Sequence, residues 1–144
     1  MRVLILLISS SLDRLIALGT VVLGLVSMGH EVSIYATQSA SFAFLKNAAN
    51  DIGDYVGDSS LLSYLREVKQ GYEEALAGGR FFRWYEMLAQ ARELGNVRIY
   101  VCTQPFELAG IKVSEDDLIN IVDGLVMVGK FVELLEWADK VITI

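Results

Sequence analysis

The residue types that can do chemistry are scarce in this chain, and one of them stands at an informative position. The 144-residue sequence holds a single cysteine, Cys102, a single histidine, His30, and a single proline, Pro105. Cys102 ends the apolar run at residues 97–101, and a polar turn follows it. Because a thiolate is both a nucleophile and a redox group, the end of this run is the first candidate for a reactive site.

The residues after Cys102 favour a short helical turn. Thr103 can cap a helix, and the proline two positions later suits its first turn. Backbone N–H groups at such a start would stabilise a thiolate or a persulfide, an effect that Glu107 opposes if its carboxylate faces the sulfur. We therefore predict that Cys102 is catalytic. Candidate substrate contacts in this turn are Thr103, Gln104 and Gly110.

Three consecutive serines form a second candidate contact surface. Ser9, Ser10 and Ser11 follow the apolar run at residues 2–8 and precede a predicted helix. Their hydroxyls could bind an anionic group of a substrate, and ordinary helix capping is the competing interpretation, which the residue types favour. In a parallel sheet the serines would lie on the same edge as Cys102, because ligands bind beyond the carboxyl ends of such strands.

The composition excludes several classes of protein. One cysteine and one histidine cannot build an intramolecular disulfide or a multi-cysteine metal site, so we expect no metal and no cofactor. The net charge of −6 argues against nucleic-acid binding. The longest apolar run, residues 15–29, is too short to span a bilayer, and residues 1–11 suit a strand and a helix cap better than a signal peptide. We therefore expect a cytoplasmic protein with no nucleic-acid or membrane partner.

Apolar runs alternate along the chain with segments of helical length. Strands are predicted at residues 2–8, 30–37, 97–101, 124–129 and 140–144, and helices at 12–28, 38–46, 61–77, 81–94, 114–123 and 129–138. Branched apolar runs without alternation are typical of parallel strands covered on both faces. The order predicts an α/β fold, a three-layer sandwich with a mostly parallel sheet of about five strands and helices on both faces. We expect the strands at 3–8 and 97–101 to be central neighbours.

Two further expectations concern domain organisation and assembly. We predict a single domain, residues 1–144, with a loop–helix insertion at 47–79. Part of its loop, at 47–60, is expected to be mobile or to form a lid over the site. The helix at 12–28 lacks a polar face, and the helix at 81–94 begins with clustered aromatic residues. A monomer of this size cannot easily bury both, so we expect a homo-oligomer.

The stretch at residues 97–144 resembles the DsrE/DsrF-like sulfur-relay family, especially its branch labelled peroxiredoxin-like. The pattern is a strand ending in cysteine, seven residues, Gly-Ile and an acidic helix start, here "VCTQPFELAGIKVSEDDL", followed by the strand–helix–strand finish "VDGLVMVGKFVELLEWADKVITI". The segment "MGHEVSIYAT" agrees more loosely. The resemblance implies a compact α/β domain, an oligomer such as a trimer, and a persulfide carried on Cys102. It also implies a partner that is a sulfur-carrying thiol protein or a small sulfane donor.

Three functions remain open for the thiol. The first is a single-cysteine sulfur carrier or sulfurtransferase, in which Cys102 takes a sulfur atom from a donor and passes it to an acceptor thiol. The second is a thiol-based oxidoreductase or redox sensor at the same cysteine. The third is a non-enzymatic ligand-binding or assembly subunit in which Cys102 only packs, as buried free cysteines often do. The resemblance makes the sulfur carrier our leading hypothesis, and whether the protein is an enzyme stays open.

Overall fold

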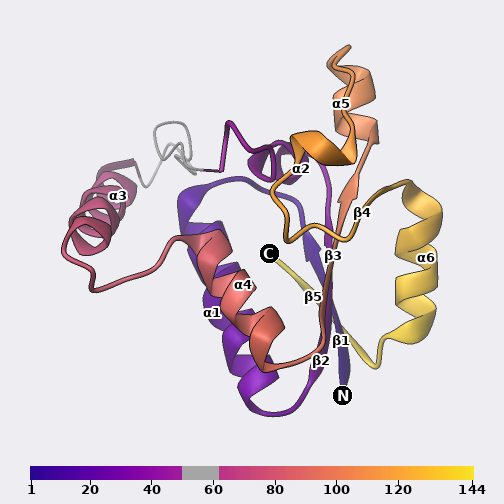
Figure 1. Ribbon diagram of the computed structural model, residues 1–144, viewed down its shortest axis with the longest axis horizontal. Coiled ribbons are helices and arrows are strands. Elements are labelled where there is room, and N and C mark those ends of the chain that lie inside the picture. Colours follow the sequence, from indigo (N-terminus) through magenta and orange to yellow (C-terminus); the bar gives the residue numbers. More distant parts are fainter. Residues whose placement is uncertain (50–61) are drawn as a thin grey trace.

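The computed structural model of the protein describes the backbone of residues 1–49 and 62–144 and the side chains of 1–49 and 66–144 (Figure 1). The elements are β1 (Arg2–Leu7), α1 (Leu12–Ser27), β2 (Glu31–Ala36), α2 (Ser39–Ala43), α3 (Leu62–Ala77), α4 (Trp84–Leu94), β3 (Val97–Cys102), α5 (Gln104–Leu108), the 3₁₀ turn η2 (Glu115–Asp117), β4 (Gly124–Val126), α6 (Val128–Trp137) and β5 (Lys140–Thr143). The lid that we expected at 47–60 lies for the most part outside the described residues.

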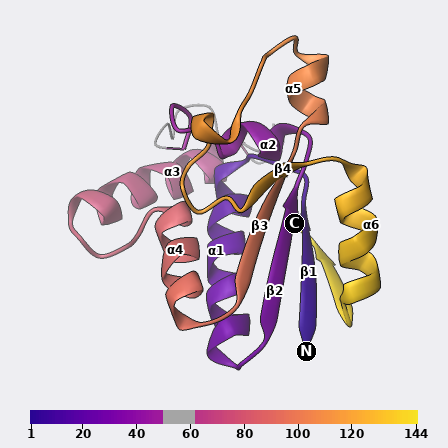
Figure 2. The same cartoon turned by 45° about the vertical axis from the view of Figure 1, so that its right-hand side comes forward.

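Within the described residues, five strands form one sheet in the order β4-β3-β2-β1-β5, and every pairing between neighbours is parallel. Helices α1 and α4 lie on one side of this sheet and α6 lies on the other, as the two views in Figures 1 and 2 show. The predicted three-layer α/β sandwich is therefore confirmed. Because all strands are parallel, their carboxyl ends meet at one edge.

The prediction that the strands at 3–8 and 97–101 are neighbours is wrong, although both are interior strands. β2 lies between β1 and β3 and pairs with each of them. A single helix, α1, connects β1 to β2, and strands joined by one such crossover usually lie side by side. β2 is at least as buried as the other two strands although its sequence is less apolar, so the apolar character of β1 and β3 could not reveal which strand lies between them.

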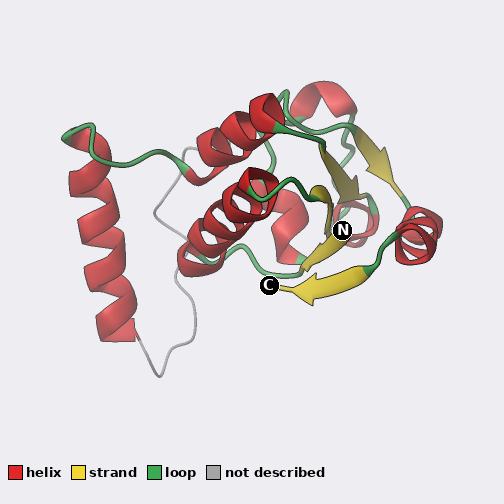
Figure 3. Ribbon diagram, turned by 90° about the horizontal axis from the view of Figure 1, so that it is seen from below, coloured by secondary structure: helices red, strands yellow, loops and turns green. Residues whose placement is uncertain are grey.

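The layer formed by α1 and α4 packs closely against the sheet. The buried residues of α1 lie along one face: Leu12, Leu15, Leu18, Gly19, Val22 and Val26. A Cβ at Gly19 would lie only 3.0 Å from the Cβ of Met87 on α4, so the absence of a side chain at Gly19 lets the two helices approach. α3 lies at the periphery of this layer (Figure 3), where the Tyr72 hydroxyl accepts a hydrogen bond from the Trp84 N–H at 2.8 Å.

Two elements near the end of the chain are shorter than the sequence predicted. The helix expected at 114–123 is a single 3₁₀ turn. Ser114 and Asp117 form a capping box around this turn, and the backbone is already extended at Leu118. Leu118 instead forms an antiparallel bridge with Leu45 and is buried. The strand expected at 124–129 ends at Val126, since α6 begins at Val128.

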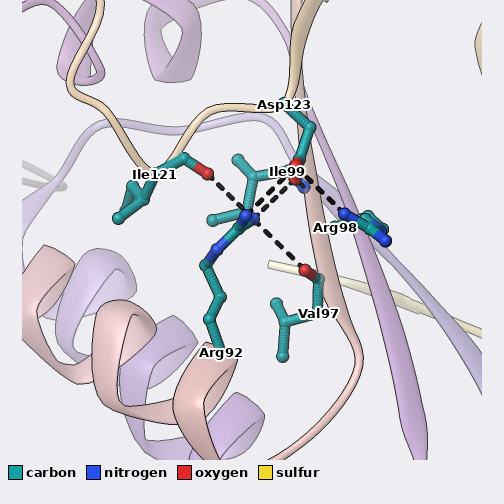
Figure 4. A network of polar contacts seen from close by, with 6 residues as sticks. All are labelled: Arg92, Val97, Arg98, Ile99, Ile121 and Asp123. Atoms are coloured by element: carbon teal, nitrogen blue, oxygen red, sulfur yellow. Dashed lines mark hydrogen bonds and ion pairs between the residues drawn. The ribbon is translucent and has the colours of Figure 1, made fainter.

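Arg92 on α4 ties the edge strand β4 to β3 (Figure 4). Its guanidinium donates to the two carboxylate oxygens of Asp123 at 2.6 and 3.1 Å, and to the main-chain oxygens of Val97 and Ile121 at 3.2 and 3.0 Å. Asp123 also accepts a hydrogen bond from the Ile99 N–H at 2.8 Å. Because Asp123 directly precedes β4, this network fixes the position of β4 along β3.

The charge of Asp123 makes this network sensitive to pH. Burial raises the pKa of Asp123, but the hydrogen bonds from Arg92 and from the Ile99 N–H outweigh burial and hold the pKa below its ordinary value of 3.8. A folded-state pKa below the unfolded value means that ionised Asp123 stabilises the fold above about pH 4, and that this contribution is lost as the pH falls below it.

We predict that Asp123→Asn lowers the free energy of unfolding at pH 7 by about 2 kcal/mol, because it breaks a partly buried charged pair. The difference from the wild type should shrink as the pH falls below about 4. Urea unfolding measured across this pH range checks both statements. Asp116→Asn, at an exposed aspartate, is the matched control and should change little. An Asp123→Asn variant as stable as the wild type at pH 7 would contradict the role given to the network.

Candidate active site

Cys102 is the last residue of β3, and its side chain is only 3% exposed. It packs in a small cluster with Leu4, Tyr35 and Leu134, on the face of the sheet that α6 covers. Buried as it is, the residue lines a cavity of about 310 Å³ at the carboxyl edge of the sheet. The thiol is therefore screened from bulk water and adjoins a space large enough for a small ligand or the end of a larger one.

The cavity draws its walls from three neighbouring strand ends and from the starts of two helices. Its lining residues are Leu6, Tyr35, Thr37, Cys102, Thr103, Gln104, Glu107, Met127, Val128 and Phe131. None of these ten is a lysine, an arginine or a histidine. The walls are thus largely apolar, with polar groups contributed by hydroxyls, one amide and the carboxylate of Glu107. Such a lining suits an uncharged organic group better than a small inorganic anion.

The backbone at Cys102 is held from two sides. The hydroxyl of Ser41, on α2, lies 3.0 Å from the carbonyl oxygen of Cys102 and 3.3 Å from that of Ala36, and it is fully buried. On the other side, the Thr103 N–H donates to the carbonyl oxygen of Val126 at 3.0 Å. The carboxyl ends of β2, β3 and β4 are thereby fixed together, and the position of the sulfur is fixed with them.

Tyr35 is the polar neighbour of the sulfur. Its side chain is 4% exposed and lies in the same buried cluster as the Cys102 side chain, and its ring packs against Phe131 at a centroid distance of 5.2 Å. Burial raises the pKa of Tyr35 above its ordinary value of 10.0, and the hydrogen bond and the charge of Cys102 raise it further. Tyr35 therefore stays protonated at neutral pH and can donate its hydroxyl hydrogen.

Two helix starts meet the cavity, and one acidic side chain opposes their electrostatic effect. α6 begins at Val128, and its first turn carries no acidic side chain, so the positive end of its dipole favours a negative charge nearby. α5 is a single helical turn that begins two residues after Cys102, and its Glu107 is an exposed residue that lines the cavity. The start of α6 thus favours negative charge in the cavity, whereas an anion that approaches Glu107 is repelled.

The candidate residues taken from the sequence fall into two groups. Thr103 and Gln104 line the cavity together with Cys102. The three serines are not among its lining residues: the Ser9 hydroxyl donates to that of Ser11 at 3.1 Å, and the Ser10 N–H donates to the Ser39 hydroxyl at 3.2 Å. They connect the end of β1 to α2. Ser11 occupies the N-cap position of α1 without a side-chain cap bond.

Gly110 also lies outside the lining residues and serves the turn after α5. Its φ of +69° is in the left-handed region, which favours glycine. The following Ile111 N–H closes the turn on the carbonyl oxygen of Phe106 at 2.9 Å. The spacing between Cys102 and Gly110 therefore reflects the length of the short helix that forms one wall of the cavity.

Sequence reasoning missed Tyr35 and Ser41. In a parallel pair, register partners point to the same face, and Tyr35 is the partner of Tyr100, two residues before Cys102. The side chains of Tyr35 and Cys102 therefore share a face, which only the strand order could reveal. Ser41 has no sequence signal, because it is one of several serines and reaches Cys102 across 61 positions of the chain.

Within the described part of the chain, no group of three or more histidine, cysteine, aspartate or glutamate side chains could hold a metal ion. The same residues contain no helix that is long and apolar enough to cross a membrane.

Comparison with known proteins agrees with this geometry. No curated protein sequence matches the chain. The family model of the DsrE/DsrF-like family matches residues 20–144, which include β2, Tyr35, the strand that ends in Cys102 and all of the cavity wall except Leu6. The match covers most of the sequence, and the fold and the cysteine at the strand end are those that the resemblance implied. The chain belongs to the DsrE/DsrF-like family.

Proposed function

We propose that the protein is a single-cysteine sulfur carrier whose Cys102 holds a sulfur atom as a persulfide. The thiolate of Cys102 attacks the outer sulfur of a donor R–S–SH, a new S–S bond forms, and the donor leaves as the thiolate R–S⁻. An acceptor thiolate then attacks the outer sulfur, and the electron pair of the broken S–S bond returns to Cys102. No oxidant or reductant is consumed, and one cysteine suffices because the partners supply the other thiols.

The observation that carries this proposal is the cavity beside the thiol in a chain of this family. Cys102 is nearly buried yet lines a space of about 310 Å³, which leaves room for an added sulfur atom and the end of a donor. The apolar walls would keep water and unrelated thiols away from a persulfide while it waits for its acceptor. A cysteine that only packs needs no such space next to its sulfur.

The charge around the cavity favours one kind of donor. Its lining holds no cationic side chain, and Glu107 is an exposed carboxylate of that lining. A neutral organic sulfane or the persulfide of a thiol protein would enter at lower cost than thiosulfate, whose two charges would lose their hydration without gaining a partner. The donor and the acceptor that we propose are therefore thiol proteins or small organic thiols.

We further propose that the protein works as a cytoplasmic homo-oligomer, a trimer if it follows the family resemblance. A free thiol that must stay reduced suits the cytoplasm. The outer face of α6 supports assembly, because Val128, Val132 and Leu135 recur there at helical spacing and are exposed, with Met127 beside them. Exposed apolar stripes of this kind commonly mark subunit contacts.

Sulfur uptake tests the proposed function. Incubation with a neutral organic trisulfide R–S–S–S–R should add the mass of one sulfur atom to the intact protein. Cys102 takes the central sulfur and releases R–S⁻, and this thiolate then removes the remaining R–S group as the disulfide R–S–S–R. A reductant should remove the added sulfur. Cys102→Ser should abolish the gain and leave the fold intact, since the exchange is nearly isosteric. A native protein whose thiol stays inert to both the trisulfide and alkylating reagents would show that Cys102 only packs. Formation of a sulfenic acid with peroxide, without any sulfur uptake, would favour the redox function instead.

The charge of the donor gives a second prediction. Glu107→Gln should speed loading from thiosulfate by up to about fivefold at low ionic strength, because it removes one repulsive charge, and the gain should fall as salt is added. Loading from the neutral trisulfide should not change. Glu136→Gln, at an exposed glutamate of α6 outside the cavity lining, is the control. Equal rates for Glu107→Gln and the wild type with thiosulfate would remove Glu107 from donor selection.

A further inference from the structure

We propose that Tyr35 is a catalytic residue, whose hydroxyl donates a hydrogen bond to Sγ of Cys102 and stabilises the sulfur as a thiolate. This inference rests on the proposed function, in which Cys102 is first the attacking thiolate and later the leaving group. The residue comes from β2 and therefore from a strand other than the one that carries the cysteine. Both side chains line the same cavity and belong to the same buried cluster.

The strand register sets the position of the tyrosine. Tyr35 pairs with Tyr100, and Cys102 follows two residues later on the same face, so the long side chain of Tyr35 can reach forward to the sulfur at the end of the strand. Packing against Phe131 at 5.2 Å limits the movement of the ring. The donor is thus held in place before the thiolate forms, which is the arrangement that makes such a hydrogen bond effective.

The proposed sulfur transfer needs an uncharged hydrogen-bond donor beside Sγ, and the phenol of Tyr35 is such a group. Burial, the hydrogen bond to Cys102 and the charge of Cys102 all raise the pKa of Tyr35, so the phenol keeps its proton. A lysine in this position would pair with an incoming anion, whereas a phenol stabilises the sulfur without attracting one. During transfer the acceptor attacks the outer sulfur, the S–S bond breaks, and the electron pair settles on Sγ, where the hydroxyl of Tyr35 stabilises the developing charge.

Few other charged side chains lie near Tyr35 and Cys102. Among the cavity residues, only Tyr35, Cys102 and Glu107 titrate, and Glu107 reaches the cavity from α5 as an exposed side chain. On α6, Lys130 pairs with Glu133 at 2.6 Å, and its Nζ lies 5.2 Å from the centre of the Tyr100 ring. β1 and β4 contribute Leu4, Leu6 and Val126 to the cluster, and the charged Arg2 lies at the opposite end of β1, where it pairs with Asp139 at 3.0 Å. Thr37, Thr103 and Gln104 also line the cavity, but among the buried residues of the cluster Tyr35 is the one that carries a hydroxyl next to Cys102.

The pH dependence of thiol reactivity tests this role. The rate of alkylation by iodoacetamide rises as the thiolate forms, and in Tyr35→Phe its midpoint should move up by about one to two pH units. The thiolate absorbance in the ultraviolet should titrate with the same shift, which separates an electronic effect from a change in access. The variant keeps the ring and its contact with Phe131, so thermal unfolding should change little. Tyr100→Phe, on the same face but outside the cavity lining, should leave the midpoint unchanged.

The two proposals fail in different ways. An unshifted midpoint in Tyr35→Phe, in a wild-type protein that takes up sulfur, overturns the role of Tyr35 and leaves the sulfur carrier standing. A shifted midpoint in a protein that takes up no sulfur supports the hydrogen bond and overturns the sulfur carrier. Equal shifts in Tyr35→Phe and Tyr100→Phe would show a general effect of removing a hydroxyl and would also overturn the inference.

Discussion

The site depends on the parallel pairing of β2 with β3. This pairing places Tyr35 and Cys102 on one face, and it brings the carbonyl groups of Ala36 and Cys102 within reach of the single buried hydroxyl of Ser41. A shift of one residue in the register would turn Tyr35 to the opposite face and separate it from the sulfur. The register is specified because both faces of these strands are buried and because Arg92 and Asp123 fix β4 on the far side of β3.

The two faces of the sheet are covered unequally, and the cavity follows from this difference. α1 and α4 pack side by side on one face, with the large core cluster beneath them, whereas α6 alone covers the other (Figure 1). The cluster under α6 is small, and its upper end opens where β3 stops and α6 begins. A fold that closed both faces equally would bury Cys102 with no space beside it. The incomplete cover therefore creates the site and also leaves the apolar face of α6 exposed.

Much of the fold follows from the sequence, and less of the site does. Apolar runs and glycine or serine boundaries identified every strand, and the end of one run placed Cys102, Thr103 and Gln104 at what is now one cavity wall. The prediction of a helix at 114–123 was wrong because a local capping box limits it to one 3₁₀ turn. Tyr35 and Ser41 could not be found, since their proximity to Cys102 depends on strand order and on a contact across 61 residues. Local patterns predict elements, whereas distant contacts complete the site.

The transfer of a labelled sulfur atom tests the central claim most directly. Protein loaded on Cys102 with radiolabelled sulfane sulfur and freed of donor is mixed with a small acceptor thiol, and the label is followed in a single turnover. We predict that the label appears in the acceptor as a persulfide while the thiol of Cys102 is regenerated in equal amount. Label that stays on the protein, or that leaves only as free sulfide, would contradict a carrier function for this cavity.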